Sequence, residues 1–193
     1  MPTSRVAAAG LGLDPPGTDQ GPLLEAALGP AAVERWLREL GLEPVERADR
    51  DAAVAWDLVL DGRRRRGLRV TVILQPDLGL ICWAHYAPPI NDAFRKSYRR
   101  LLRWNDELPF VKFAIAEDER PVLTTELPPE RADADALGLA LARLLAVADE
   151  LFDESAGWLW IGGRVPAGYG EGAPRNPGLL ERYADRLGEL LGS

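Results

Sequence analysis

Side chains that could perform acid–base or nucleophilic chemistry are scarce in this chain of 193 residues. It holds one histidine, His85, and one cysteine, Cys82, and none of its four serines stands in a Gly-x-Ser-x-Gly turn. A histidine activates a nucleophile only with a suitable partner, and a zinc site needs several His or Cys ligands. We therefore predict no catalytic residue, no metal site and no cofactor, and we expect that the protein is not an enzyme.

Two other kinds of site are a carboxylate acid–base pair and a glycine-rich phosphate-binding loop. The 30 acidic residues could form a carboxylate acid–base pair, but most of them lie in expected turns, helix caps and polar faces, where solvation explains them. The glycine-rich segments Gly10–Gly12 and Gly168–Gly172 lack the strand–helix context and the lysine of a phosphate-binding loop. We interpret both segments as linkers.

The chain is acidic, with a net charge of −7 and a pI near 4.9. Such a balance opposes a general affinity for nucleic acids or anionic membranes. Arg63 to Arg66 form the one basic cluster, and we interpret them as an exposed hairpin tip kept soluble by its charge. The alternative is a regulator that contacts nucleic acid through these arginines. An apolar run around Cys82 and the absence of a membrane-length apolar stretch favour a reducing, cytoplasmic location.

The first half of the chain predicts a helix followed by a meander of strands. Apolar residues three and four apart predict a helix from Pro30 to the stop at Gly41, and a charged connector over 43–50 follows. Alternating patterns then predict strands over 54–60, 68–74 and 80–86. The short turns between these strands favour an antiparallel sheet.

The second half predicts two long helices around a hairpin, and a short helix after them. Their expected ranges are a helix from a cap at Asn91 or Asp92 to Pro109, strands over 110–116 and 121–127, a helix from Asp133 or Asp135 to about Phe152, and a final helix from Asn176–Pro177. The order favours an α+β fold, in which helices pack on a five-stranded antiparallel sheet.

The third strand carries apolar side chains on both of its faces. If Leu80, Cys82 and Ala84 face the helices, then Trp83 points to the opposite side of the sheet, where the neighbouring strands add Val59 and Ile73. An apolar outer face must be covered by a tail, a second subunit or a ligand. We predict a binding or dimer surface there, and the alternative is that the C-terminal helix covers it.

Asn105 interrupts the apolar stripe of the second long helix. A buried amide must find hydrogen-bond partners. We expect these partners to be backbone groups of the turn at Leu108–Pro109, so that Asn105 sets the direction in which the next strand leaves the helix. This role is structural, not catalytic.

The segments Leu101–Asn105, Phe110–Ile115 and Val122–Leu123, together with the leucine-rich third helix, resemble the YbjN-like family. That family is similar in fold to the type III secretion chaperones. The resemblance covers about residues 30 to 155, and the order of elements agrees with it. It implies a small homodimeric domain that binds proteins or peptides in a chaperone-like or regulatory role, without catalysis.

The same resemblance makes Asn105 and Lys112 the positions that match the family's characteristic polar residues. We therefore expect Val59, Ile73, Trp83 and Lys112 to contact a protein or peptide partner, and no membrane. The predicted organisation is a disordered leader (1–22), a YbjN-like α+β domain (23–161), and a Gly/Pro-rich linker with an amphipathic helix (162–193). The leader, the arginine turn and the tail after Trp160 depart from the family pattern.

Overall fold

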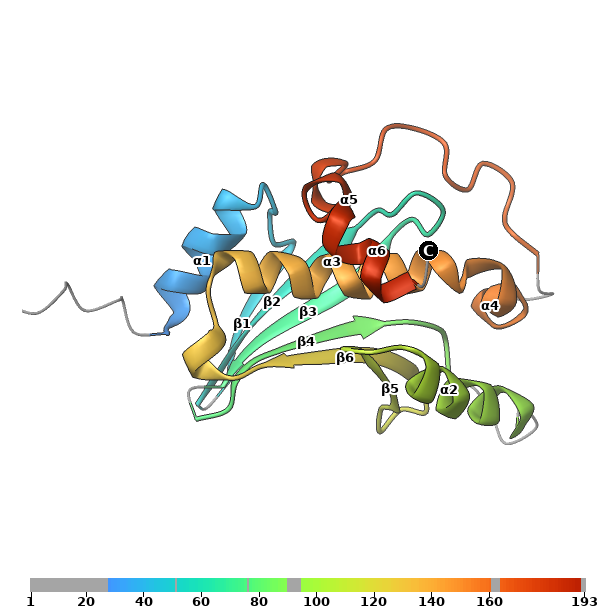
Figure 1. The fold of residues 1–193 in the computed structure, drawn as a ribbon, viewed down its shortest axis with the longest axis horizontal. Helices are drawn as coiled ribbons and strands as arrows, with labels where there is room; N and C mark the ends of the chain where they lie inside the picture. Colours follow the sequence, from blue (N-terminus) through green and yellow to red (C-terminus); the bar gives the residue numbers. More distant parts are fainter. Residues whose placement is uncertain (1–27, 51, 76, 90–94, 161–163, 192–193) are drawn as a thin grey trace, which may run out of the picture.

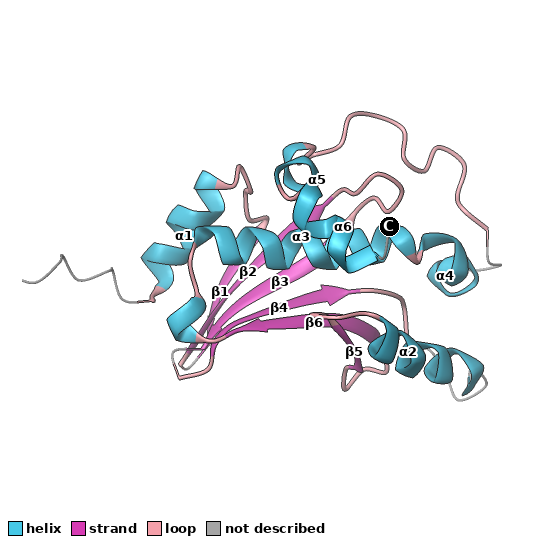
Figure 2. Ribbon diagram, viewed as in Figure 1, coloured by secondary structure: helices cyan, strands magenta, loops and turns pink. Residues whose placement is uncertain are grey.

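The computed structural model describes residues 28–50, 52–75, 77–89, 95–160 and 164–191. A layer of helices lies over one antiparallel sheet (Figure 1), and Figure 2 shows the two layers by type of secondary structure. The helices are α1 (Pro30–Glu39), α2 (Arg95–Glu107), the short 3-10 helix η2 (Pro129–Arg131), α3 (Ala134–Glu150), α4 (Phe152–Leu159), α5 (Gly178–Arg182) and α6 (Ala184–Leu191). The strands are β1 (Glu46–Arg50), β2 (Ala53–Leu60), β3 (Leu68–Gln75), β4 (Gly79–His85), β5 (Lys112–Ile115) and β6 (Pro121–Leu127).

The sheet confirms the predicted α+β fold with one strand more than expected. Its order is β1-β2-β3-β4-β6-β5, and every neighbouring pair is antiparallel. The additional strand is β1, which occupies the expected charged connector. Four of its five residues are charged, so it lacks the alternating apolar pattern by which a strand is recognised. Only its backbone pairing with β2 identifies it.

The inner face of the sheet packs on α3. One cross-strand row of this face consists of Leu58, Val70, Ala84 and Leu123, none of which is more than 1 % exposed. Leucines on α3 meet this face: Leu137, Leu141, Leu144 and Leu145. The apolar stripe predicted for this helix is therefore confirmed, and it supplies the core.

Helix α3 is buried on more sides than its stripe predicts, because α1 and the C-terminal helices also pack on it. Asp149, expected on a solvated polar face, is accordingly buried. Gly138 permits the close approach of the tail, since a Cβ on this residue would lie 2.2 Å from the hydroxyl oxygen of Tyr183. Tyr183 itself is 2 % exposed. The third predicted helix is also shorter than expected, and α4 continues the chain after a break at Leu151.

Helices α5 and α6 lie in the helical layer, not on the opposite face of the sheet (Figure 1). Leu179, Leu180 and Leu187 are buried with the core residues. The alternative in which the C-terminal helix covers the outer face of the sheet is therefore wrong. Its apolar stripe is instead used against α3.

Several predictions fall outside the described residues. These are the leader over 1–22 and the helix caps at Asn91 and Asp92. No helix in the described ranges is long and apolar enough to cross a membrane.

Candidate binding surface

The outer face of the sheet carries the predicted binding residues in adjacent rows. Trp83 lies opposite Thr71 on one side and Thr124 on the other, and Thr124 lies opposite Lys112. Ile73 stands one row away, opposite Ala55 and Ile81: the row is Ala48, Ala55, Ile73 and Ile81. Val59 begins a third row on the same face. The alternation read from the sequence therefore placed Val59, Ile73 and Trp83 on one side of the sheet correctly, and the structure adds Lys112 to the same side. The role of these four residues in binding stays a prediction.

A hollow of about 500 Å³ lies on this outer face, over β1 to β4. Its lining residues are Glu46, Ala48, Arg50, Ala53, Ala55, Asp57, Thr71, Ile73, Trp83 and His85. The small side chains of Ala48, Ala53 and Ala55 form its floor over β1 and β2, and the larger side chains of Ile73 and Trp83 line it beside them. All five of these side chains are half-buried, not fully exposed. The outer face thus combines an apolar floor with a charged rim.

Trp83 brings an unused hydrogen-bond donor to this surface. Its indole Nε1 is buried, and it has no hydrogen-bond partner among the described residues. Its ring stacks on that of His85, with 6.3 Å between the ring centroids. A buried indole N–H normally finds an acceptor, so a carbonyl or carboxylate oxygen of a bound segment would satisfy it once the ring turns to bring the N–H to the surface.

The polar groups beside Trp83 interact with one another and with nearby charges. The Thr71 hydroxyl donates to Asp57 Oδ1 over 2.6 Å. Burial lowers the pKa of His85, and the positive charges of Arg120 and Arg69 lower it further, whereas Asp57 and Asp118 act in the opposite direction.

On the inner face, burial raises the pKa of the Cys82 thiol to about 12, which leaves this group protonated at neutral pH. The described residues include no group of three or more His, Cys, Asp or Glu side chains that could hold a metal ion.

Lys112 and Asn105 join the end of α2 to β5. The Asn105 amide donates to the Phe113 carbonyl oxygen over 3.0 Å and accepts from the Phe113 backbone N–H over 2.6 Å. The Lys112 ammonium donates to the backbone oxygens of Asn105 and Leu108, over 2.7 and 2.9 Å. It thereby caps the C-terminal end of α2, where a positive charge is favourable.

The structural role predicted for Asn105 is thus confirmed, with a different partner. The expected partners were backbone groups of the turn at Leu108–Pro109, whereas the amide pairs with β5 itself. Lys112 starts on the outer face, but its ammonium group is turned toward the helix end. We therefore expect it to contribute less to binding than Trp83.

The YbjN family profile, described as "Putative bacterial sensory transduction regulator", matches residues 30–156. The chain belongs to the YbjN family. No curated protein matches it. The part matched by the YbjN profile contains the whole sheet, the outer face and the Asn105–Lys112 connection, whereas α5 and α6 lie beyond it.

The arginine turn of this YbjN member, Arg63 to Arg66, is fixed by its backbone to the end of α3. The Asp149 carboxylate accepts from the backbone N–H groups of Arg63, Arg64 and Arg65, over 2.6, 3.0 and 2.6 Å. Gly62 must be small here, because a Cβ would lie 2.2 Å from Asp149 Oδ1. Three donors converge on one buried carboxylate, so the turn is held rigidly.

Two of the four arginine side chains, those of Arg64 and Arg65, are also engaged within the chain. Arg64 forms an ion pair with Asp153, and Arg65 donates to the Tyr86 carbonyl oxygen over 3.0 Å. Burial lowers the pKa of the Arg65 guanidinium. The backbone N–H of Arg66 donates to the Tyr169 hydroxyl over 2.7 Å. The interpretation of this turn as an exposed, solvated tip therefore holds for Arg63 and Arg64, which are exposed, and is wrong for Arg65 and Arg66, which are half-buried under the segment that precedes α5.

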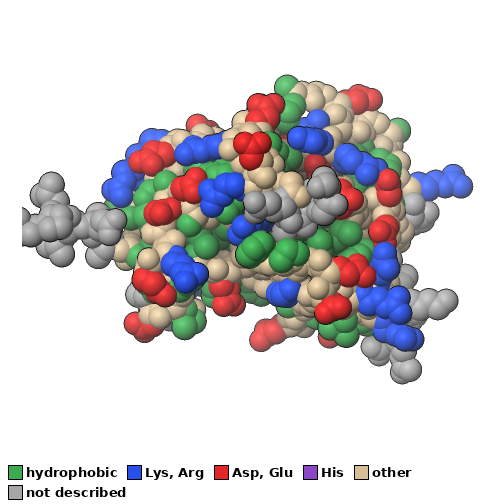
Figure 3. Space-filling model, viewed as in Figure 1, with side chains coloured by type: hydrophobic (Ala, Val, Ile, Leu, Met, Phe, Trp, Pro, Cys, Tyr) green, Lys and Arg blue, Asp and Glu red, His purple; other side chains and the backbone are tan. Residues whose placement is uncertain are grey.

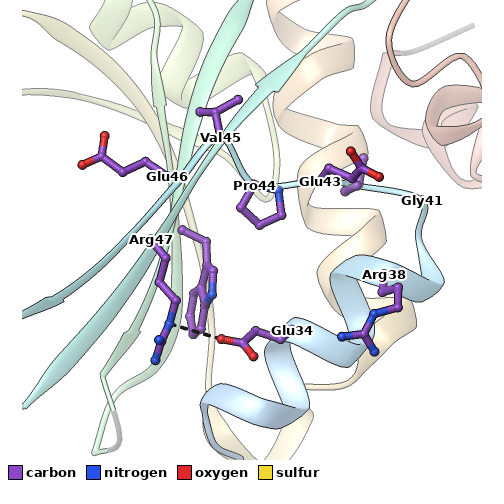
Figure 4. A pocket seen from close by; sticks show the side chains of 10 residues that line it. Glu34, Arg38, Gly41, Glu43, Pro44, Val45, Glu46 and Arg47 are labelled. Atoms are coloured by element: carbon purple, nitrogen blue, oxygen red, sulfur yellow. Dashed lines mark ion pairs between the residues drawn. The ribbon is translucent and has the colours of Figure 1, made fainter.

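A second hollow, of about 660 Å³, lies between α1 and the β1 edge (Figure 4). Glu34 reaches from α1 to Arg47 on β1, with 3.1 Å between the charged atoms. The buried indole Nε1 of Trp56, one of the lining residues, has no partner among the described residues. The Glu34–Arg47 ion pair ties α1 to the edge of the sheet. No sequence signal indicated this hollow, since its β1 wall was expected to be a connector.

Proposed function

We propose that this chain is a non-enzymatic bacterial regulator that binds a segment of another protein on the outer face of its sheet. The observation that carries the proposal is the combination of an uncovered apolar floor with the unpartnered indole N–H of Trp83. An apolar sheet face exposed to water is normally an interaction site. The description of the YbjN family as a regulator supports the general class.

A peptide segment fits this surface better than a compact small molecule. The hollow is partly open and extends over four strands, whereas small-molecule sites enclose most of their ligand. An extended segment can place small apolar side chains on the Ala53–Ala55 floor and offer backbone oxygens to the Trp83 N–H. The rim, with Glu46, Arg50 and Asp57, offers charges of both signs for orienting the segment.

The finer features of the proposal are a chaperone-like holding of the partner, a homodimeric form and a cytoplasmic location. A regulator that works by holding a partner needs no active site. Oligomers of this size are most often two-fold dimers.

The alternative, a regulator that contacts nucleic acid through Arg63 to Arg66, has less support. Arg64 is paired with Asp153, and the Arg65 guanidinium is committed to a backbone oxygen. Acidic and basic side chains intermingle over the face drawn in Figure 3. Phosphate-backbone binding requires a basic surface and weakens steeply with salt. Binding to a DNA duplex that falls steeply between low and physiological salt, and that is lost in Arg63→Ala, would favour this alternative.

The test of the main proposal is a selection of peptides from a random displayed library against the purified chain. The affinity of each selected peptide is then measured for the wild type, Trp83→Ala and Leu102→Ala. Leu102 is a matched control, because it is an apolar side chain 68 % exposed on α2, away from the outer face. We expect Trp83→Ala to weaken binding at least about tenfold, as for a central aromatic contact, and Leu102→Ala to leave it unchanged. Equal affinities for the wild type and Trp83→Ala would contradict the proposal.

A further inference from the structure

Strand β1 is an unpaired edge of the sheet. It is the first strand in the order, and among the described strands only β2 pairs with it. Its central residue, Ala48, is half-buried, and the four flanking residues are exposed. An edge of this kind presents free backbone donors and acceptors that another strand can use.

The order of charges along β1 is complementary to that of a second, antiparallel copy of the same strand. The strand is Glu46-Arg47-Ala48-Asp49-Arg50. When two copies run antiparallel with Ala48 opposite Ala48, each Glu46 faces Arg50 of the other copy, and each Arg47 faces Asp49. Every charged position then meets an opposite charge, which stabilises cross-strand pairs. A parallel arrangement in the same register would instead place each charge opposite an identical one.

A second observation points to a missing positive charge beside Glu46. On the other side of this residue, within the sheet, Asp57 of β2 lies directly opposite. Two carboxylates in opposed positions destabilise a strand pair. Within the described residues neither Glu46 nor Arg50 takes part in an ion pair or a side-chain hydrogen bond. Arg50 of a second copy would supply the counter-charge that Glu46 lacks.

We propose that two copies of this chain pair through β1 as antiparallel edge strands, about a two-fold axis at Ala48. The proposal rests on the homodimeric form proposed above and adds its surface, symmetry and register. It joins the two six-stranded sheets into one. The outer faces become continuous across the axis, because Ala48 belongs to both the edge and the floor of the hollow. A bound segment could then extend from one copy to the next.

Charges on an edge strand also serve to prevent unwanted pairing. The order of the charges decides between these roles, because a strand that only repels would carry like charges opposite each other in the antiparallel approach of its own copy. In the antiparallel approach of two β1 strands, each charge instead faces an opposite charge. The Glu34–Arg47 ion pair, shown as a dashed line in Figure 4, further holds the strand against α1 before any association.

The experiment is a charge exchange at Glu46 and Arg50, with the dimer dissociation constant measured by sedimentation across a range of concentrations. Glu46→Arg alone and Arg50→Glu alone each create two like-charge contacts per dimer, and we expect each to weaken association about tenfold or more. The double variant Glu46→Arg/Arg50→Glu restores both contacts and should associate like the wild type. An equimolar mixture of the two single variants should also recover dimers, because the two arginines at these positions in one variant then face the two glutamates at the same positions in the other.

The outcomes separate this proposal from the earlier ones. Single variants that dimerise as tightly as the wild type would overturn the β1 register. The chain would then still be a homodimer, but its interface would lie elsewhere. Failure of either the double variant or the mixture to recover dimers would likewise overturn the register. A wild type that stays monomeric at all concentrations would overturn the homodimer itself. Unchanged melting temperatures of the single variants would exclude misfolding, and peptide binding to Trp83 is measured independently.

Discussion

The two faces of the sheet differ in what they contact. Along β2, neighbouring residues alternate between the faces, so that Leu58 is 1 % exposed under α3 whereas Val59 is half-buried on the outer side. Both faces carry apolar side chains, but among the described residues only the inner face is covered by helices. The C-terminal helices, which could have covered the outer face, add to the inner layer instead. The proposed function uses the side that the described helices leave uncovered.

The arginine turn (Arg63 to Arg66) and strand β1 also differ in whether their charges are paired within the chain. The arginine turn is the most basic run of the chain, yet its backbone and much of its side-chain charge are bound internally. Strand β1 looks like a plain polar connector, yet Glu46 and Arg50 stand free of ion pairs within the described residues.

The largest expected effect is a loss of stability from truncation on the inner face. Leu58→Ala should lower the free energy of unfolding by about 3 kcal/mol, because it leaves a cavity in a closely packed core. Ile73→Ala, on the outer face, should cost about 1 kcal/mol or less, since the site is already open to water. Urea unfolding with an unchanged m-value measures both. Equal losses would contradict the distinction between the faces.

Removing the carboxylate that fixes the arginine turn should have the next largest effect. Asp149→Ala leaves three backbone N–H groups without their acceptor. We expect the free energy of unfolding to fall by about 2 to 3 kcal/mol. Asp153→Ala is the matched control, because it removes only an exposed partner of Arg64. The control should leave the melting temperature nearly unchanged. A similar loss in both variants would show that the turn is held by side-chain charge instead.

Much of this fold could be predicted from the sequence. Alternation identified the core strands and their two faces because each inner residue needed an apolar neighbour, and helical spacing identified the packing stripe of α3. Strand β1 escaped prediction because an edge strand with exposed side chains needs no apolar pattern. The roles of Asp149 and Tyr183 escaped it because their partners lie far away along the chain. The outer face was predictable, whereas its uncovered state depended on where the C-terminal helices pack.

A smaller effect is expected at Lys112, which lies at the border of the outer face. Lys112→Ala removes two hydrogen bonds to the end of α2 and should cost about 0.5 kcal/mol of stability. Its effect on the affinity of a selected peptide should be less than that of Trp83→Ala. Calorimetry of unfolding and peptide titration measure the two quantities. A loss of affinity as large as that of Trp83→Ala would place the binding site closer to β5.

The smallest expected effect is a dependence of stability on pH from His85. The pKa of this residue is lowered in the folded protein, chiefly by burial and by Arg120, so the unfolded chain takes up a proton first as the pH falls. The stability contributed by neutral His85 is therefore complete above its ordinary pKa of 6.5 and decreases as the pH falls from there toward the folded value. Melting temperatures of the wild type and His85→Gln should converge at about pH 7.5 and separate near about pH 5.5. Parallel curves at both pH values would contradict the lowered pKa.

The most direct measurement of the central claim is the NMR signal of the Trp83 indole N–H during titration with a selected peptide. The free protein leaves this donor without a partner among the described residues, so a bound acceptor oxygen should shift its proton signal downfield and slow its exchange with water. Spectra of Trp83→Phe assign the signal. A saturable downfield shift at Trp83, with little change at the Asp149 turn, is the result that binding on the outer face predicts. Saturable binding that leaves the Trp83 signal unmoved would contradict it.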